Sequence, residues 1–421
     1  MIRLIILSVF IFSTFYSFSA PGDTTRIRVH DAVDMVWYEN YDQQVIFPEG
    51  NTSYGKILMH YTMGCASTGC SDWDYTTKIE LRKPLGYYDS TVASIDTISQ
   101  DPLEVDTTWN VYEVKESFEL ARVITPYGGY MRVGSNGYNS SWTHVHTFDV
   151  TDYAPLFKDT AEIRAFYGGW SSGFSVTIDF EFIEGTPPRE VLEVRNLWQS
   201  GGNGWGYQNE TSFDNDYLQP ISVEFPLGTE SSMLRVVPSG HGFDNNTSCA
   251  EFCQRNYYLK MDGTQIGSNL MWDADCGLNP IYPQGGTWLY DRANWCPGLR
   301  THRFDHDLTG LISEEGVYDF DIDIQNITWS GNQAPVYIWE TQLFIYGNKS
   351  FQHDAAIEDI ISPSLKDDYK RFNPICNHAT VEIKNYGSQN LTSATIRYSV
   401  NGNNWRSYQW TGNLVFEETE I

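Results

Sequence analysis

Alternating apolar and polar residues recur along the chain and predict β-strands. Residues 176–182 read Val-Thr-Ile-Asp-Phe-Glu-Phe, so every second side chain is apolar, as in a strand with one buried face. Residues 318–324 repeat this pattern, and residues 394–400 do so again before Asn401-Gly402, a strong hairpin signal. No long stretch has the period of an amphipathic helix. Many short strands between Gly, Asn and Asp turns predict an all-β chain built of sandwiches.

The length of 421 residues is too great for one such sandwich. Pro187-Pro188 follows a predicted strand, and paired prolines end sheet pairing. A second break falls near residues 345–350, before an acidic stretch and a small strand-rich segment. We therefore expect one jelly roll over residues 21–187 and another over 188–349. An acidic linker and the start of an immunoglobulin-like module are expected over 350–421.

The first residues are typical of a secretory signal peptide. Arg3 precedes an apolar run that ends at Tyr16, and small residues follow at Ser19 and Ala20. The run is too short for a membrane anchor, and no later segment resembles one. The sequence predicts that residues 1–20 are removed near Ser19 or Ala20 and that the protein is exported without membrane insertion.

The charge of the chain narrows its partners. It carries 27 Lys+Arg against 54 Asp+Glu, a formal net charge of −27. Nucleic acids and anionic membranes are bound by basic surfaces, so the composition argues against both. Aromatic residues make up 15% of the chain, with 14 Trp and 27 Tyr. They suit stacking on sugar rings, but β-sandwich cores use the same residues.

Two carboxylates lie beside short cysteine loops. Asp74 follows Cys65-Ala-Ser-Thr-Gly-Cys70-Ser-Asp-Trp73, and Glu251 lies inside Cys249-Ala-Glu-Phe-Cys253. A tight disulfide loop would stiffen the backbone around each acid, and catalysis by positioning needs that stiffness. The alternative is that each loop is only a covalent staple with a solvated acid.

Seven cysteines accompany this pattern. Export permits disulfides, and six of the seven fall into three neighbouring pairs: Cys65 and Cys70, Cys249 and Cys253, Cys276 and Cys296. Spacing alone does not fix their connectivity. The seventh, Cys376, has no neighbour, and one place for its partner is beyond residue 421.

A series of motifs over residues 28–347 resembles one enzyme family. In order they are Phe47-Pro48, Lys56-Ile-Leu-Met, Trp73-Asp74 after its cysteine loop, Arg122-Val-Ile-Thr-Pro126-Tyr127, Phe148-Asp-Val-Thr-Asp152, Ser239-Gly-His241-Gly242, Cys249-Ala-Glu251-Phe-Cys253, Cys276-Gly-Leu-Asn-Pro280 and Tyr290-Asp-Arg292-Ala-Asn-Trp295-Cys296-Pro-Gly298. Together they resemble peptide-N-glycosidase F and its secreted bacterial relatives, amidases that release whole N-linked glycans from glycoproteins.

The resemblance implies two eight-stranded antiparallel jelly rolls side by side, with the active site in the cleft between them. It implies the disulfides Cys65–Cys70, Cys249–Cys253 and Cys276–Cys296. It also implies N-glycosylated proteins or glycopeptides as substrates, without a cofactor or a metal. The residues that match the family's site are the catalytic Asp74 and Glu251 and the substrate-binding Trp73, Trp170, Arg292, His241 and Phe252.

These residue types suit amide hydrolysis. The reaction needs an activated water and a proton for the departing glycosylamine, and two carboxylates can share these tasks if their pKa values differ. We expect Asp74 to act as general base or to orient the substrate, and Glu251 to position the amide or the water. Arg292 would stabilise an oxyanion or clamp a carboxylate, while an ion pair that only holds the Cys276–Cys296 loop is the alternative.

The chain also departs from the family pattern. Gly168 stands where the family has a third important glutamate, and Tyr75 where it has an arginine. His241 and Phe252 each replace a tryptophan. The glycines around Trp170 predict a flexible loop at the rim of the cleft. Either another glycan core fits at Gly168, or the protein binds glycans without cutting them.

Two other classes stay open. Paired jelly rolls also occur in copper monooxygenases, and His144-Val-His146 places two imidazoles on one face of a strand, where they could bind copper or zinc. His302 and His306 form another pair, but no third ligand has an evident spacing near either pair. The other class is an adhesive or glycan-binding protein, which a trailing immunoglobulin-like module suits.

Overall fold

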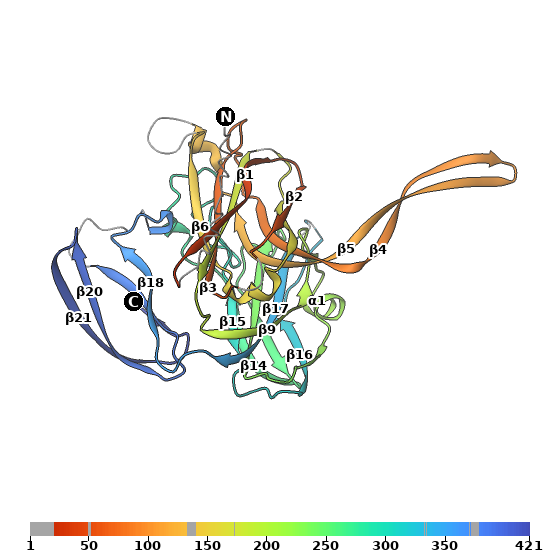
Figure 1. Cartoon of the computed structure of the whole chain (residues 1–421). Coiled ribbons are helices and arrows are strands. Elements are labelled where there is room, and N and C mark those ends of the chain that lie inside the picture. Colours follow the sequence, from red (N-terminus) through yellow and green to blue (C-terminus); the bar gives the residue numbers. More distant parts are fainter. Residues whose placement is uncertain are drawn as a thin grey trace, which may run out of the picture.

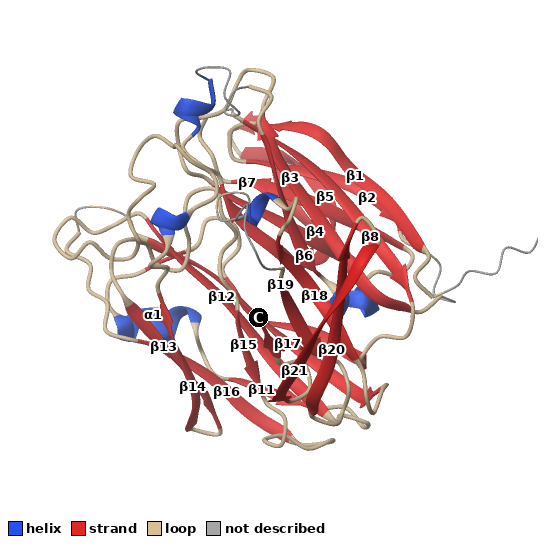
Figure 2. Cartoon of the chain, turned by 90° about the vertical axis from the view of Figure 1, so that its left-hand side faces the viewer, coloured by secondary structure: helices blue, strands red, loops and turns tan. Residues whose placement is uncertain are grey.

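A computed structural model describes residues 21–48, 52–132, 140–171, 173–331, 333, 335–369, 371 and 379–421. The expected signal peptide and Cys376 lie outside the described residues. Strands dominate, and the helices are few and short (Figure 2). The all-β class predicted from the sequence is confirmed. The described helices are α1 (Glu210–Tyr217) and the single-turn or two-turn 3₁₀ helices η1 (Gly128–Arg132), η2 (Thr151–Leu156), η3 (Cys276–Leu278) and η4 (Asp367–Tyr369). No helix among these residues has the length and apolarity to cross a bilayer.

The first half of the chain forms two four-stranded antiparallel sheets, ordered β1-β8-β3-β6 and β2-β7-β4-β5. The strands are β1 (Thr24–Met35), β2 (Glu39–Ile46), β3 (Tyr54–Cys65), β4 (Thr76–Gln100), β5 (Leu103–Ile124), β6 (Thr143–Asp149), β7 (Thr160–Tyr167) and β8 (Phe174–Glu184). In β8, Ile178, Phe180 and Phe182 are fully buried in one core with Ile163 of the other sheet. The alternation read from the sequence at residues 176–182 therefore marks the buried face of a strand.

The second half repeats the arrangement of two facing sheets. One sheet is ordered β10-β17-β12-β15 with β9 also paired to β17, and the other is ordered β11-β16-β13-β14. The strands are β9 (Arg189–Gln199), β10 (Trp205–Gly206), β11 (Ile221–Glu224), β12 (Ser231–His241), β13 (Arg255–Met261), β14 (Thr264–Met271), β15 (Phe304–Asp307), β16 (Val317–Ile324) and β17 (Val336–Lys349). A second core fills the space between the sheets. The predicted strand at 318–324 lies in β16, and the jelly-roll connectivity of both halves stays a prediction.

A smaller β module ends the chain and packs beside the two halves (Figure 1). It contains β18 (Ala355–Ser362), β19 (Thr380–Asn385), β20 (Leu391–Val400), β21 (Asn403–Leu414) and β22 (Thr419–Glu420). Ile383, Trp410 and Leu414 form its small core. Asn401-Gly402 joins β20 to β21, so the predicted hairpin is confirmed.

Strands β4 and β5 are 25 and 22 residues long, so the expectation of short strands is wrong for this pair. β7 pairs with β4 only as far as Arg82, and beyond that point β4 and β5 pair with each other alone. The pair projects from the first half as a two-stranded ribbon (Figure 1). Pairing can continue past the sheet because each strand satisfies the backbone groups of the other along one edge.

Backbone hydrogen bonds join the two halves next to the end of β5. The Ile124 N–H donates to the Leu299 carbonyl (3.0 Å), and the Thr301 N–H donates to the Arg122 carbonyl (2.9 Å). The Arg122 side chain is fully buried and donates to Ser239 Oγ (2.8 Å) and the Ile338 carbonyl (2.9 Å) in the second half. These contacts fix one half against the other beside the Arg122–Tyr127 and Ser239–Gly242 motifs.

Candidate active site

Asp74 lies in the segment between β3 and β4, shortly after the Cys65–Cys70 disulfide. Its neighbours are held by Thr125: the Thr125 hydroxyl donates to the Trp73 carbonyl (3.1 Å) and accepts from the Tyr75 N–H (2.7 Å). The Asp74 side chain is 15% exposed. The backbone on both sides of this carboxylate is therefore fixed, as positioning requires.

Glu251 lies inside the Cys249–Cys253 disulfide loop of the second half. The Glu251 N–H donates to the Gly242 carbonyl (3.0 Å), and the Gly242 N–H donates to Glu251 Oε2 (3.1 Å). The Ala293 N–H donates to the Glu251 carbonyl (2.9 Å) and ties the loop to the segment that carries Arg292. The side chain of Glu251 is 13% exposed.

The fully buried guanidinium of Arg292 lies between the two carboxylates. Its Nε donates to Glu251 Oε1 (3.0 Å), and its Nη2 lies 3.8 Å from Asp74 Oδ2. The remaining donors reach the Thr287 and Tyr290 carbonyls (3.0 and 2.6 Å), Thr287 Oγ1 (2.8 Å) and the Tyr127 hydroxyl (3.3 Å). All five N–H groups of the guanidinium thus have partners within the protein.

Burial raises the pKa of both carboxyl groups. For Glu251 burial and the nearby Asp74 charge raise the pKa to about 7, against the opposing effect of Arg292. Burial also raises the pKa of Asp74, while a hydrogen bond from the Tyr127 hydroxyl and the charge of Arg292 lower it. Two neighbouring carboxyl groups with raised pKa values can hold and move a proton near neutral pH.

Aromatic side chains flank the carboxylates. Trp73 and Trp170 lie with ring centroids 5.5 Å apart and are 49% and 45% exposed, so both offer a face to solvent. Phe252 lies beside the Arg292 guanidinium, 5.2 Å from its ring centre. His241 instead stacks on Trp295 (5.0 Å), and its Nε2 lies 2.8 Å from Ser239 Oγ. Burial, with help from Arg122 and Arg292, lowers the pKa of His241 to about 3, so its imidazole is neutral.

The glycines beside Trp170 are required by packing, and the flexibility of this loop stays a prediction. A Cβ on Gly169 would lie 2.5 Å from the Tyr167 and Tyr75 rings, and one on Gly173 would lie 2.1 Å from the Ser71 nitrogen. The Ser71 N–H donates to the Gly173 carbonyl (3.2 Å). The loop that carries Trp170 is therefore held against the segment that leads to Asp74.

The sequence did not identify two residues of this cluster, Tyr127 and Thr287. The Tyr127 hydroxyl bonds Asp74, lies 3.2 Å from Thr287 Oγ1 and accepts from Arg292. Tyr127 ended one of the matched motifs, but only its three-dimensional position shows its contact with Asp74. Thr287 carried no signal, because a lone threonine in a loop has none.

The three expected disulfides are all present: Cys65–Cys70, Cys249–Cys253 and Cys276–Cys296. The second histidine pair does not converge. His302 Nε2 lies 3.2 Å from Asp273, whereas His306 Nε2 lies 2.7 Å from the Tyr257 hydroxyl. His302 and His306 thus serve separate contacts rather than one ligand site.

Comparisons with known proteins agree with this architecture. The family model described as "Peptide-N-glycosidase F, C terminal" matches residues 208–343. Peptide-N(4)-(N-acetyl-β-D-glucosaminyl)asparagine amidase F of Elizabethkingia miricola is 24% identical over 338 residues, which are 76% of this chain and 83% of that protein.

Solved structures share the fold. PNGase F, a glycosylasparaginase from Flavobacterium meningosepticum, superposes with a TM-score of 0.61 at 21% identity, over 78% of this chain and 97% of that one. PNGF-II gives a TM-score of 0.59 at 15% identity, over 78% of this chain and 66% of that one. In sequence and in fold the chain is a peptide-N-glycosidase F-like protein.

Proposed function

We propose that the protein is an exported amidase that hydrolyses the side-chain amide bond of glycosylated asparagine and so releases N-linked glycans. One observation carries the proposal. Asp74 and Glu251 come from different halves of the chain, and both carboxylates converge on the same buried Arg292 guanidinium. Burying three charged groups together is costly, and such clusters with raised carboxyl pKa values are typical of catalytic sites.

In the proposed reaction Asp74 draws a proton from the attacking water. The water oxygen bonds to the amide carbon, the C–N bond breaks, and the glycosylamine nitrogen leaves with the proton that Asp74 took from the water. The raised pKa of Asp74 makes this carboxylate a stronger base than an exposed aspartate. Its hydrogen bond from Tyr127 fixes the carboxylate for the attack.

Glu251 positions the amide, and Arg292 holds Glu251 by a hydrogen bond while its charge lies 3.8 Å from Asp74. The two Glu251 oxygens accept from Arg292 Nε and the Gly242 N–H, an arrangement that favours the ionised carboxylate as an acceptor. Arg292 has no spare donor for a developing oxyanion. Of the two roles expected for Arg292, we therefore propose the clamp on the carboxylates.

The glycan is proposed to lie against the exposed faces of Trp73 and Trp170. Both rings stand near the segment that carries Asp74, and aromatic faces pack against the C–H surfaces of sugars. Phe252 would contact the substrate beside Arg292, while His241, stacked on Trp295, would support this wall. A Cβ at Gly168 would lie 3.2 Å from the Thr76 carbonyl, so this backbone leaves little room for an acid there.

The test is mass spectrometry of a denatured N-glycoprotein incubated with the purified mature protein. The wild type is expected to release an intact glycan and to convert its asparagine to aspartate. Asp74→Asn should abolish the conversion with a nearly unchanged melting temperature, because the amide keeps the shape of the side chain. Asp72→Asn, an exposed neighbour, is the matched control and should retain the activity.

If the wild type converts no asparagine to aspartate on any of several glycan types, the amidase proposal is overturned. This result would assign the chain to the glycan-binding class instead, and a glycan array would then identify its ligand. Unaltered turnover by Asp74→Asn would leave an amidase but remove Asp74 from its chemistry.

A further inference from the structure

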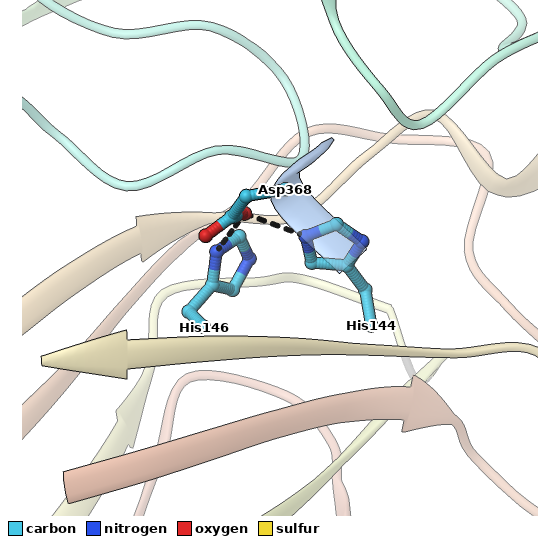
Figure 3. A group of neighbouring side chains, drawn as sticks. All are labelled: His144, His146 and Asp368. Carbon is cyan, nitrogen blue, oxygen red and sulfur yellow. Dashed lines mark hydrogen bonds and ion pairs between the residues drawn. The ribbon is translucent and has the colours of Figure 1, made fainter. Parts of the chain in front are cut away.

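A second cluster of buried ionisable side chains lies away from the candidate active site. His144 and His146 project from the same face of β6, and Asp368 of η4 closes over them (Figure 3). Asp368 Oδ1 lies 3.1 Å from His144 Nε2 and 3.6 Å from His146 Nδ1. The two imidazole rings are 4.5 Å apart between centroids. Three nitrogen and oxygen ligand atoms thus face one another from two segments of the chain.

These separations match those of a metal site. Ligand atoms about 2.0–2.2 Å from a tetrahedral Zn²⁺ lie about 3.3–3.5 Å from each other. The two distances from Asp368 Oδ1 to the imidazoles, 3.1 and 3.6 Å, bracket that value. The longer one exceeds a normal hydrogen bond, so this pair of atoms gains little from direct contact.

Hydrogen bonds within the cluster do not account for the burial of His146. Its side chain is fully buried, and neither ring nitrogen has a hydrogen-bond partner within the part of the chain that the structure describes. An unpartnered buried polar atom costs free energy.

The surroundings hold Asp368 in place. Arg300 donates to the other carboxylate oxygen of Asp368, Oδ2 (3.0 Å), and this pairing leaves Oδ1 to the histidines. The Val145 N–H donates to Asp367 Oδ2 (2.8 Å), so the backbone of β6 also holds a side chain of η4. The charge of Arg300 opposes a cation, but its side chain is 45% exposed, so solvent screens it.

We propose that His144 Nε2, His146 Nδ1 and Asp368 Oδ1 bind one Zn²⁺ ion, with a water as the fourth ligand. Two imidazoles and a carboxylate are a ligand set that zinc favours. The ion would fasten η4, which lies between β18 and β19 of the terminal module, to β6 of the first half. The site shares no residue with the candidate active site, so the zinc proposal does not rest on the proposed amidase.

Zinc binding to the full mature chain tests the proposal. The protein is stripped with a chelator, desalted and titrated with Zn²⁺ by calorimetry, and the bound metal is counted by elemental analysis. One Zn²⁺ per chain is expected. Asp368→Asn should weaken binding at least tenfold, because the amide keeps the shape and the contact with His144 but loses the charge. His353→Ala removes an exposed histidine and should bind zinc like the wild type.

His144→Ala and His146→Ala should also lose zinc binding. Two further readouts keep the result decisive if these two variants fail to fold. Zn²⁺ should raise the melting temperature of the wild type but not that of Asp368→Asn. Co²⁺ in place of Zn²⁺ should give the visible absorption of a tetrahedral site in the wild type alone. The proposal is overturned if the stripped wild type binds no stoichiometric zinc, or if Asp368→Asn binds it equally well.

Discussion

Arg292 shows how one buried cation organises the candidate site. Its guanidinium donates to five acceptors and lies near both Phe252 (5.2 Å) and Trp295 (4.8 Å), whose rings favour a cation at their faces. A residue bound on every side cannot move toward a substrate. Its hydrogen bonds hold the Glu251 carboxylate and the Tyr127 hydroxyl, and its charge acts on Asp74 from 3.8 Å.

Tyr127→Phe tests the role of that hydroxyl. The change removes the hydrogen bond to Asp74 and should lower kcat/KM about 10- to 100-fold, the usual range for a hydrogen bond to a charged group. Since this bond lowers the pKa of Asp74, the acidic limb of the pH–rate profile should also move to higher pH. Tyr130→Phe, at an exposed tyrosine, is the control. An unchanged profile would show that Tyr127 only fills space.

Glu251 makes stability depend on pH. Its pKa is raised from 4.5 to about 7, so the folded state keeps a proton that the unfolded state loses in this range. The contribution is present below pH 4.5 and is lost as the pH rises through 7. Relative to the wild type, Glu251→Gln should gain up to about 3 kcal/mol of unfolding free energy between pH 4.5 and 8.

Urea denaturation of both proteins at the two pH values measures this gain. Glu39→Gln, at an exposed glutamate, should follow the wild type at both. A difference between Glu251→Gln and the wild type that does not vary with pH would contradict the raised pKa.

At the scale of elements, the sequence predicts strands where alternate side chains are buried or partly buried, and it fails where none is. The predicted strands at 176–182, 318–324 and 394–400 lie in β8, β16 and β20. The outer parts of β4 and β5 carry apolar residues that no core covers, so alternation there gives no sign of the length of the ribbon. The length over which two strands pair beyond a sheet is set by hydrogen bonds between their backbones. The pattern of side chains does not encode that length.

In the candidate active site and the proposed zinc site, the sequence likewise identifies some residues and misses others. Asp74, Glu251 and Arg292 were found through motifs that resemble a known family, because disulfide loops and short motifs are local features of a sequence. Tyr127, Thr287 and Asp368 were missed since their contacts exist only after folding. Asp368 in particular is separated from His144 by 224 residues.

The outer ribbon gives a prediction at this scale. Its exposed apolar side chains are Leu85, Tyr87, Tyr88, Val92, Ile95, Ile98, Leu103, Val105, Trp109, Val111 and Tyr112. Since Pro84 pairs with Lys115, replacing residues 86–113 by Asn-Gly should close the ribbon with a tight turn. The melting temperature should change by less than about 3 °C, and self-association should fall because exposed apolar surface is removed. Scanning calorimetry and light scattering measure both, and loss of folding would contradict the account.

At the scale of the whole molecule, the two halves form the candidate site and the terminal module braces them. Lys56 pairs with Glu358 (2.5 Å) and Arg189 with Glu417 (2.7 Å), so charged side chains of both halves reach acids of the module. A polar cavity of about 170 Å³ lies among these groups. The module thus contacts the halves through ion pairs rather than through a shared apolar core.

A chain that ends at Lys349 tests whether the two halves alone form the site and the module only stabilises them. Asp74, Glu251 and Arg292 precede that residue, as do their partners within the described part of the chain, so glycan release should stay within about twofold of the full chain. The melting temperature should fall by several degrees, because Lys56 and Arg189 lose their acidic partners. Loss of activity in a shortened chain that still melts cooperatively would place part of the site in the module.

The central claim is that Asp74 and Glu251 act together on one amide bond. The most direct measurement is turnover of a single N-glycopeptide in heavy-oxygen water by the wild type, Asp74→Asn, Glu251→Gln and the double variant. We predict that the wild type releases the glycan and leaves one labelled oxygen in the new aspartate. Each single variant should lose at least about 10³-fold in kcat/KM, and the double variant should be little worse than either, as for residues that act as a unit. No glycan release by the wild type, or losses that simply multiply in the double variant, would contradict the account.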